Sequence, residues 1–328
     1  MQRSQDPTVS VVVPTRNEAR NLEVVLPAIA AVRPAVHEVV VVDGNSVDGS
    51  VETAQRVLPW ARIVQQTRKG KGNAMATGFA AATGDIVVMF DADGSADPAE
   101  IPAFVSALVR GADFAKGTRF ARGGGSDDIT ALRRLGNSGL NGVANALFGT
   151  RHSDLCYGYN AFWADLLPLL ELPAVDAQAP EDGSMLWGDG FEIETVLACR
   201  VAAAGLRVAE VPSYERERMF GATNLRTFVD GTRVLRTLAA ERRRAMRRTA
   251  PAAGRPEVPA VPVAVRRPLV QFEGPSAPAH PDGQAAAIRR PRVPETVSTA
   301  TPAAGLRAFD QSSDRNDEPR SDSRSGAA

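Results

Sequence analysis

Short runs of apolar residues recur along the first part of the chain, separated by segments with helical spacing. The runs are rich in Val and Ile, as in strands that are buried on both faces. They predict strands at 9–15, 38–44, 62–67, 86–90 and 113–120. The segments between them predict helices at 18–32, 48–58, 72–83 and 98–110. This alternation indicates one α/β domain with a mostly parallel sheet covered by helices on both faces.

The second half is less regular. It predicts a helix at 131–149, a strand at 206–212 and a basic amphipathic helix at 223–248. Beyond that point the chain is rich in Pro, Ala and Arg and holds few aromatic residues. Such a composition buries too little apolar surface to offset the entropy lost on ordering. We therefore predict three regions, which are a flexible N-terminus (1–7), a folded domain (8–248) and a disordered tail (249–328).

Charge and cysteine content narrow the class of protein. Basic and acidic residues balance at 38 each, which argues against nucleic acid as a partner. Cys156 and Cys199 match neither a disulfide framework nor a zinc site, as expected in a reducing cytosol. No apolar run reaches the ~20 residues that span a bilayer, and no secretory signal is recognisable. We expect a cytoplasmic protein, either soluble or peripheral at a membrane.

Carboxylates follow two of the predicted strands directly. Asp43 ends the strand at 38–44, and Asp91 and Asp93 follow the strand at 86–90. In parallel sheets ligands bind at the carboxyl ends of the strands, so these side chains are expected at one edge. An Asp-X-Asp sequence suits Mg²⁺ or Mn²⁺, which take oxygen ligands and share them with phosphates. The same sequence is also common in solvated turns, so by itself it does not identify a metal site.

The glycine pattern argues against two common nucleotide-binding folds. In "GKGNAM", Gly70 and Gly72 are present, but Met75 stands where the dinucleotide fingerprint requires a third glycine. The segment also lies in mid-domain rather than directly after the first strand. A phosphate-binding loop of the form Gly-x-x-x-x-Gly-Lys-Ser/Thr does not occur in the sequence.

Four segments in a fixed order give a more specific signal. They are "VVVPTRNEARNL" (11–22), "VVVVDGNSVDGS" (39–50), "RKGKGNAMATG" (68–78) and "GDIVVMFDADGSADP" (84–98). Together they resemble glycosyltransferase family 2, whose members have the Rossmann-like glycosyltransferase-A fold. The most similar subgroup is the dolichol- or polyprenyl-phosphate sugar synthases, and weaker likeness extends the resemblance over residues 8 to 226. One departure is the motif Val-Asp43-Gly44-Asn45-Ser46, which has one aspartate where the family usually has paired aspartates before Gly-Ser.

The resemblance implies a donor site at the ends of the first four strands and an acceptor site beside it. Asp91 and Asp93 would hold Mg²⁺ or Mn²⁺, and Arg218 would close over the donor diphosphate. The residues implied to contact the nucleotide-diphospho-sugar are Pro14, Thr15, Asn17, Glu18, Asp43, Lys71, Gly72, Asp91, Ala92, Asp93 and Arg218. Those implied to contact the acceptor or a phosphate are Arg119, Arg133, Asn137 and Asn224.

The need for a catalytic base depends on the acceptor. In this family the acceptor attacks the anomeric carbon in line as the nucleoside diphosphate leaves, with inversion. A sugar hydroxyl needs a carboxylate to take its proton, whereas a lipid phosphate is already anionic. "GDGFEIET" (188–195) offers Asp189, Glu192 and Glu194 for this role. The two glutamates lie about 200° apart on a helix, so only one can face the site, and the family pattern favours Glu192. Asp189, Glu192 and Asp93 are thus the catalytic candidates.

The sequence therefore predicts an inverting, metal-dependent glycosyltransferase that moves a hexose to an acceptor, with polyprenyl phosphate as the first choice. One alternative acceptor is the hydroxyl of a soluble sugar or metabolite. An alternative of another class is a sugar-nucleotide-binding protein without turnover. The basic helix at 225–248, with apolar residues such as Leu235 and Leu238, suits peripheral contact with the inner face of the plasma membrane. A helix packed on the domain with a solvated basic end is the other interpretation.

Overall fold

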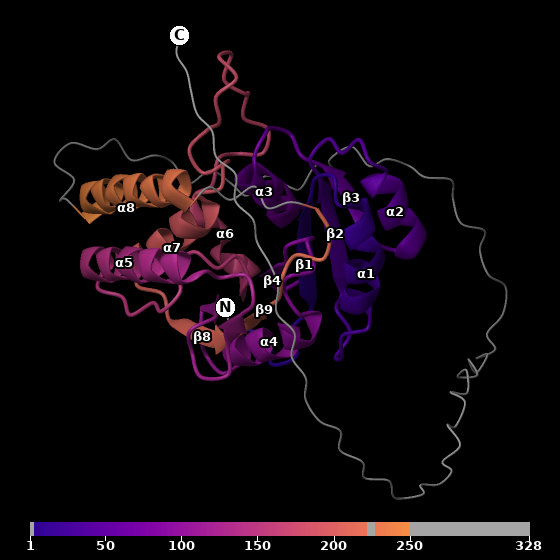
Figure 1. Cartoon of the computed structure of the whole chain (residues 1–328), viewed down its shortest axis with the longest axis horizontal. Coiled ribbons are helices and arrows are strands. Elements are labelled where there is room, and N and C mark those ends of the chain that lie inside the picture. Colours follow the sequence, from indigo (N-terminus) through magenta and orange to yellow (C-terminus); the bar gives the residue numbers. More distant parts are fainter. Residues whose placement is uncertain (1–2, 222–226, 250–328) are drawn as a thin grey trace, which may run out of the picture. The chain divides into compact units, whose positions relative to one another are not determined.

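The computed structural model describes residues 3–221 and 227–249 (Figure 1). The predicted tail lies outside the described residues apart from Thr249, and Asn224 lies outside them as well. Among residues 1–7, those described form no helix or strand. Arg3 nevertheless pairs with Asp113 at 2.5 Å and with Asp165 at 3.1 Å, which ties this segment to the domain.

Within the described residues, a 7-stranded sheet in the order β3-β2-β1-β4-β7-β5-β8 forms the centre of the domain. Neighbouring strands pair in parallel except at β7, which runs antiparallel to both β4 and β5. The strands are β1 (Val9–Thr15), β2 (Glu38–Asp43), β3 (Arg62–Gln65), β4 (Ile86–Met89), β5 (Phe114–Thr118), β7 (Asn160–Trp163) and β8 (Val208–Pro212). A separate sheet pairs β6 (Gly125–Ser126) with β9 (Tyr214–Glu215). The prediction of a mostly parallel α/β sheet is confirmed.

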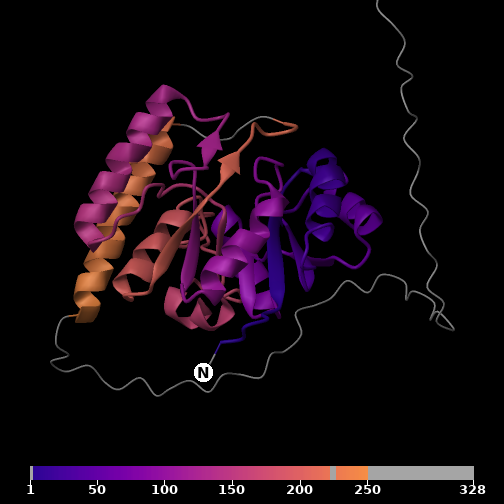
Figure 2. The ribbon, with the colours of Figure 1, turned by 90° about the horizontal axis from the view of Figure 1, so that it is seen from below.

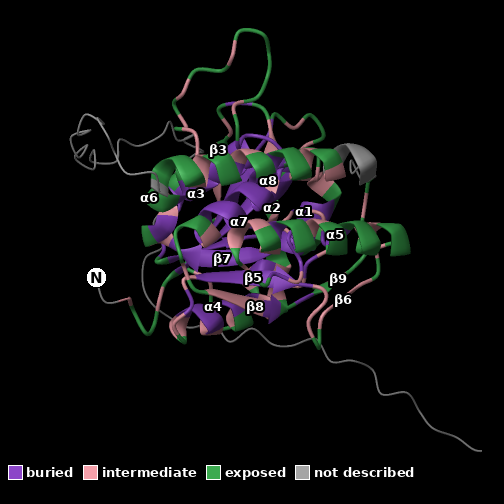
Figure 3. Cartoon of the chain, turned by 90° about the vertical axis from the view of Figure 1, so that its left-hand side faces the viewer, coloured by how far each residue is buried: buried purple, intermediate pink, exposed green. Residues whose placement is uncertain are grey.

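Helices cover both faces of this sheet (Figures 1 and 3). One face carries α1 (Ala19–Ala30), α2 (Ser50–Val57) and α4 (Ile101–Val109), with the short η1 (Pro98–Glu100) leading into α4. The other face carries α3 (Lys71–Ala81) and α7 (Ile193–Ala203). The side chains of β7 show the division, because successive residues of a strand point to opposite faces. Phe162 meets Phe79 of α3, whereas Tyr159, just before β7, stacks on Phe104 of α4.

Two long helices form an outer layer beside α7. Figure 2 shows α5 (Ala131–Phe148) and α8 (Thr227–Thr249) side by side, and both pack on α7. Glu241 of α8 makes a buried ion pair with Arg200 of α7 and accepts a hydrogen bond from the indole N–H of Trp187. Leu238 is fully buried in the contact between α8 and α7. The sequence predicted it on an exposed apolar face of the helix, and it does not lie there. The short η2 (Ala164–Leu166) and α6 (Leu167–Leu170) precede α7.

Candidate active site

The parallel strands bring the predicted carboxylates to one edge of the sheet. Thr15 at the end of β1 lies beside Asp43 at the end of β2, and β4 pairs with the other side of β1. Asp91 and Asp93 follow β4. These strands are buried on both faces, as Val11, Val12 and Val13 and their neighbours on β2 and β4 show. The edge is the candidate active site.

Lys71 is the centre of the first charge cluster at this edge. Its ammonium group lies 2.8 Å from Asp91 and 2.7 Å from Glu194. The three side chains come from the start of α3, the end of β4 and the first turn of α7. Burial alone would lower the pKa of Lys71, but the two carboxylates outweigh it and raise that pKa. Burial also raises the pKa of Asp91, although Lys71 opposes the shift.

Glycines allow the backbone to approach this cluster closely. A Cβ atom at Gly158 would lie 3.0 Å from a carboxylate oxygen of Asp91 and 3.3 Å from the Lys71 ammonium. At Gly72 it would lie 1.9 Å from the carbonyl oxygen of Gly188, which no side chain can tolerate. The role that the structure shows for Gly72 is therefore close packing of the start of α3 against the segment before α7.

Arg218 is the centre of the second charge cluster. Its guanidinium lies 2.7 Å from Glu18, before α1, and 3.4 Å from Asp93. The other oxygen of Asp93 accepts hydrogen bonds from the backbone and side chain of Ser95, at 3.0 and 2.7 Å. Gly94 between them has φ +77°, a conformation that favours glycine. Each carboxylate of the Asp-X-Asp turn thus faces a basic side chain from a different part of the chain.

Glu192 and Asp189 lie outside both clusters. Glu192 accepts hydrogen bonds from the backbone N–H groups of Gly188 and Gly190, at 3.0 and 3.2 Å. The helix α7 begins at Ile193, later than expected, so Glu192 remains in the preceding turn and its carboxylate satisfies that turn. In this geometry Glu194, and not Glu192, joins the Lys71 cluster, and the role of Glu192 as a base stays a prediction.

Asp189 forms a bidentate ion pair with Arg68, at 2.7 and 3.0 Å. Their side chains are 1% and 3% exposed. The backbone carbonyl of Asp189 also accepts a hydrogen bond from Asn73 of α3. In this position Asp189 fixes the loop before α7 to the start of α3, and its carboxylate is not available to a substrate. The structure therefore shows Asp189 in a buried structural contact, and its expected catalytic role stays a prediction.

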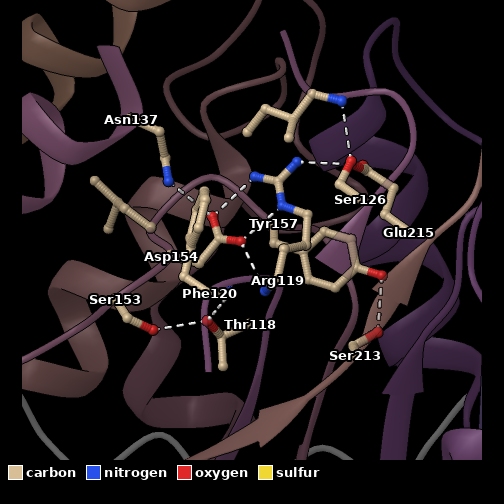
Figure 4. Close-up of polar contacts among 12 residues, drawn as sticks. Thr118, Arg119, Phe120, Ser126, Asn137, Ser153, Asp154, Tyr157, Ser213 and Glu215 are labelled. Atoms are coloured by element: carbon tan, nitrogen blue, oxygen red, sulfur yellow. Dashed lines mark hydrogen bonds and ion pairs between the residues drawn. The ribbon is translucent and has the colours of Figure 1, made fainter. Parts of the chain in front are cut away.

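Arg119 and Asn137 meet in a separate buried network around Asp154 (Figure 4). Arg119 grips Asp154 at 2.7 and 2.9 Å and pairs with Glu215 at 2.9 Å. Asn137 donates a hydrogen bond to Asp154 at 3.1 Å, and its own side-chain oxygen has no partner in the described structure. The cation of Arg119 is thus already neutralised by two carboxylates. Sequence reasoning gave no role to either acidic partner, because nothing in the sequence shows that side chains 35 and 96 residues away lie beside Arg119.

Arg133 lies one helical turn before Asn137 on α5. Its guanidinium is 3.3 Å from Asp128, and both side chains are partly exposed. It does not join the Asp154 network among the contacts of the described residues. Of the four residues implied to contact the acceptor, the structure brings together Arg119 and Asn137, places Arg133 nearby on the same helix as Asn137, and does not describe Asn224.

The residues implied to border the nucleotide mostly shape their own loops. Asp43 accepts backbone hydrogen bonds from Asn45 and Ser46, at 3.0 and 3.2 Å. Asn17, with φ 57°, accepts one from Val47 at 2.9 Å, which joins the ends of β1 and β2. The remaining residues of this set lie in the strand end or turn where the sequence placed them, and they are Pro14, Thr15 and Ala92.

Metal binding at this edge would depend on the substrate. Among the described residues, no group of three or more acidic, His or Cys side chains is arranged to hold a metal ion. Asp91 and Asp93 supply carboxylate oxygens of the kind that Mg²⁺ and Mn²⁺ prefer. These residues fit an ion that takes the rest of its ligands from water and from a diphosphate, and they do not fit a metal held by protein alone.

Known proteins are similar to this chain in sequence and in fold. A family model described as glycosyl transferase family 2 matches residues 10–167. Undecaprenyl-phosphate mannosyltransferase from Micrococcus luteus is 30% identical over 236 residues, which are 69% of this chain and 91% of that protein. Dolichol-phosphate mannosyltransferase from Pyrococcus furiosus is 36% identical over 135 residues, which are 40% of this chain. That alignment spans 38% of the length of the Pyrococcus furiosus protein.

Among solved structures, the fold is similar to that of glucosyl-3-phosphoglycerate synthase from Mycobacterium tuberculosis. That structure has a TM-score of 0.55 and 25% identity, and the alignment covers 72% of this chain and 80% of that one. It was crystallised with Mn²⁺, UDP-glucose and phosphoglyceric acid.

Proposed function

This chain belongs to glycosyl transferase family 2, and from that premise we propose that it transfers a hexose from a nucleotide-diphospho-sugar to polyprenyl phosphate, with inversion and with Mg²⁺ or Mn²⁺. Its family and its glycosyltransferase-A fold make it a glycosyltransferase. The proposal adds the donor class, the metal, the stereochemistry and the acceptor.

The observation that carries the choice of acceptor is the pairing of the carboxylates at the candidate active site. Lys71 pairs with Asp91 and Glu194. Arg218 pairs with Glu18 and Asp93. In this donor-free arrangement each of the four carboxylates is already engaged by a cation, so none of the four is placed as a free acceptor for the proton of a hydroxyl group. A phosphate monoester is anionic at neutral pH and attacks without a base.

The relatives support the same choice. The Micrococcus luteus protein, which aligns along most of its length, is named for transfer of mannose to undecaprenyl phosphate. The structural neighbour was crystallised with a UDP-sugar and Mn²⁺, which supports a nucleotide-diphospho-sugar donor and a divalent metal here.

The chain's own residues give the site two roles in such a transfer. Mg²⁺ or Mn²⁺ held by Asp91 and Asp93 would neutralise charge that develops on the departing diphosphate. Lys71 and Arg218, now paired with carboxylates, would turn to the diphosphate oxygens once a donor is bound. A planar guanidinium such as that of Arg218 can grip two oxygens at once.

If the acceptor is a lipid, the protein must reach it at the membrane surface. Leu132 and Leu135 of α5 are 55% and 72% exposed, and Leu235 of the neighbouring α8 is 45% exposed. Apolar side chains with arginines beside them favour binding at an anionic interface. None of the described helices is long and apolar enough to cross a membrane. We therefore include contact of α5 and α8 with the membrane surface in the proposal.

The experiment compares undecaprenyl phosphate with undecaprenol, two acceptors that differ in the phosphate group. Radiolabelled nucleotide sugars are supplied with Mn²⁺ or Mg²⁺, and label is measured in the organic phase. The proposal predicts at least about 100-fold faster labelling of the phosphate, a margin expected when the attacking oxygen no longer needs a base. Equal labelling of both lipids would contradict it.

A soluble acceptor is the second candidate. It is favoured by the structural neighbour, whose crystals contain the soluble phosphoglyceric acid. Label that appears in water-soluble products, and never in lipid, would select this candidate over the first. Donor binding without any transfer or hydrolysis would select a non-catalytic sugar-nucleotide-binding protein.

A further inference from the structure

The segment at residues 216–221 crosses the candidate active site and is attached on both sides. On one side Arg216 and Met219 donate backbone hydrogen bonds to the carbonyl groups of Ser95 and Asp93, at 2.8 and 3.1 Å. Arg218 lies between these attachments. Two backbone hydrogen bonds therefore hold the 216–221 segment along the Asp-X-Asp turn, and its position sets where the Arg218 guanidinium can reach.

On the other side the segment is attached to Asn21, in the first turn of α1. The side-chain oxygen of Asn21 accepts a hydrogen bond from the backbone N–H of Phe220 at 3.1 Å, and its NH₂ group donates to the carbonyl of the same residue at 3.2 Å. The NH₂ group also donates to Glu18, the ion-pair partner of Arg218. Asn21 is 2% exposed, so water does not compete for these bonds.

Two side-chain contacts also hold the 216–221 segment. The guanidinium of Arg20 lies 4.1 Å from the centre of the Phe220 ring, in a cation–π contact. Met219 fills the space above Gly94, where a Cβ atom would lie 2.7 Å from its sulfur. The side chain of Phe220 is thus held by Arg20, and the side chain of Met219 packs against Gly94 of the Asp-X-Asp turn.

We propose that Asn21 is a positioning residue for the transfer reaction: it fixes the main chain of Phe220 and thereby sets Arg218 at the place where the donor diphosphate binds. This inference rests on the proposed function, since it assumes a diphosphate-containing donor. Asn21 uses both sides of its amide on one residue, only two positions from Arg218, and at the same time orients Glu18, with which Arg218 pairs in the free protein.

The test replaces Asn21 by Ala and reads two quantities. The first is hydrogen exchange of the Phe220 amide in the free protein, which is expected to be about tenfold faster because its acceptor is lost. The second is affinity for UDP, GDP, ADP and CDP with Mn²⁺, measured by calorimetry. The diphosphate that binds the wild-type chain is expected to bind about tenfold more weakly. Ala has a higher helix propensity than Asn, so α1 itself is not weakened.

A matched control is available in α5. Asn145 binds the backbone of His152 in the same two-sided way, at 2.8 and 2.9 Å. Asn145→Ala removes the same kind of bonds away from the candidate active site, and its diphosphate affinity is expected to stay at the wild-type value. Arg20→Ala, an exposed change, is expected to shift both readouts in the direction of Asn21→Ala by about two- to fivefold.

A double variant identifies positioning of Arg218 as the cause. If Asn21 acts through Arg218, then Asn21→Ala adds no further loss of diphosphate affinity to Arg218→Ala. Unchanged exchange at Phe220, or faster exchange with wild-type affinity while Arg218→Ala binds weakly, overturns the inference. If the wild-type chain binds none of the four diphosphates, the proposed function fails, and the exchange comparison with Asn145→Ala still decides whether Asn21 holds the segment.

Discussion

Lys71 and Arg218 approach the Asp-X-Asp turn from opposite sides, and each bridges one aspartate of the turn to a glutamate. Lys71 joins Asp91 to Glu194, and Arg218 joins Asp93 to Glu18. The cost of taking four carboxylates partly out of water is reduced because each faces a cation. A donor diphosphate with its metal would exchange these pairs for new ones of the same kind. In the free protein these four carboxylates are therefore paired, as the proposed exchange with a charged donor requires.

Glu194 and Glu192 are predicted to differ in effect although they are two residues apart. Glu194→Gln keeps the shape but leaves Lys71 with one carboxylate, so its ammonium group is less firmly placed. We expect kcat/KM for the donor to fall about tenfold, as for loss of a charge-assisted contact. Glu192→Gln retains an oxygen acceptor for Gly188 and Gly190, and kcat/KM is expected to stay within about twofold. Steady-state kinetics that show the opposite order would contradict this assignment.

His152 is predicted to make stability depend on pH. Burial, assisted by the charge of Lys116 and opposed by Glu210, lowers the pKa of His152 from 6.5 to about 4. Between these values the folded protein binds fewer protons than the unfolded chain, so the free energy of unfolding falls as pH is lowered through this window. The loss is at most about 3 kcal/mol.

The measurement is urea unfolding at pH 6.5 and pH 4 of the wild-type chain and of His152→Asn. Paired carboxylates also lose stability in this range, so the informative quantity is the difference between the two proteins. The variant is expected to lose less stability over the window. Parallel loss in both proteins would show that His152 does not titrate as described.

At the scale of elements, the first turns of α3 and α7 build the site together. Asp189 and Arg68 form the buried ion pair that joins the loop before α7 to the loop before α3. The backbone N–H groups of Gly72 and Asn73 donate to carbonyls in the same loop. Lys71 and Glu194 follow directly from these two loops, so their 2.7 Å contact depends on a junction made several residues earlier in each segment.

Asp189→Ala is predicted to act on stability. It leaves the Arg68 guanidinium buried without a counter-charge, which costs about 3 to 5 kcal/mol of unfolding free energy. Glu23→Ala removes the partner of Arg56 in a pair whose side chains are more than half exposed, and is expected to cost less than about 1 kcal/mol. Both are measured by urea unfolding. An Asp189→Ala protein of wild-type stability without turnover would restore the catalytic role expected from the sequence.

The elements were more predictable than their ends. Runs of Val and Ile predicted β1, β2 and β4, because strands that are buried on both faces need a continuous apolar sequence. The start of α7 was not predictable to the residue, since "GDGFEIET" allows Glu192 either in the first turn or before it. The choice is made by two glycine N–H groups that need an acceptor, which is a tertiary requirement. The same holds for the network around Asp154, whose partners come from distant segments.

At the scale of the whole molecule, the sheet carries the candidate active site at the ends of its strands. Helices α1, α2 and α4 cover one face, α3 and α7 cover the other, and α5 and α8 pack on α7. Glu241 and Leu238 hold α8 to this core from within the described residues. Among the described residues, those that attach α8 precede Thr249. The boundary that composition suggests near residue 248 therefore stays a prediction that can be tested by truncation.

A chain that ends at Thr249 is predicted to fold and to keep its activity. Its melting temperature is expected to stay within about 2 °C of that of the full chain, because less than about 0.5 kcal/mol should be lost. Calorimetry and donor turnover check the two expectations. Loss of both together would move the domain boundary into the tail.

The most direct test of the account is transfer of label from a panel of radiolabelled nucleotide sugars, with Mn²⁺ or Mg²⁺, to an extracted bacterial lipid fraction, run beside Asp93→Ala. The account predicts metal-dependent label in the organic phase from one donor, and at least about 100-fold less with the variant, as when an electrostatic contact to the transition state is removed. Donor hydrolysis or binding without labelled lipid, or lipid labelling that Asp93→Ala leaves unchanged, would contradict it.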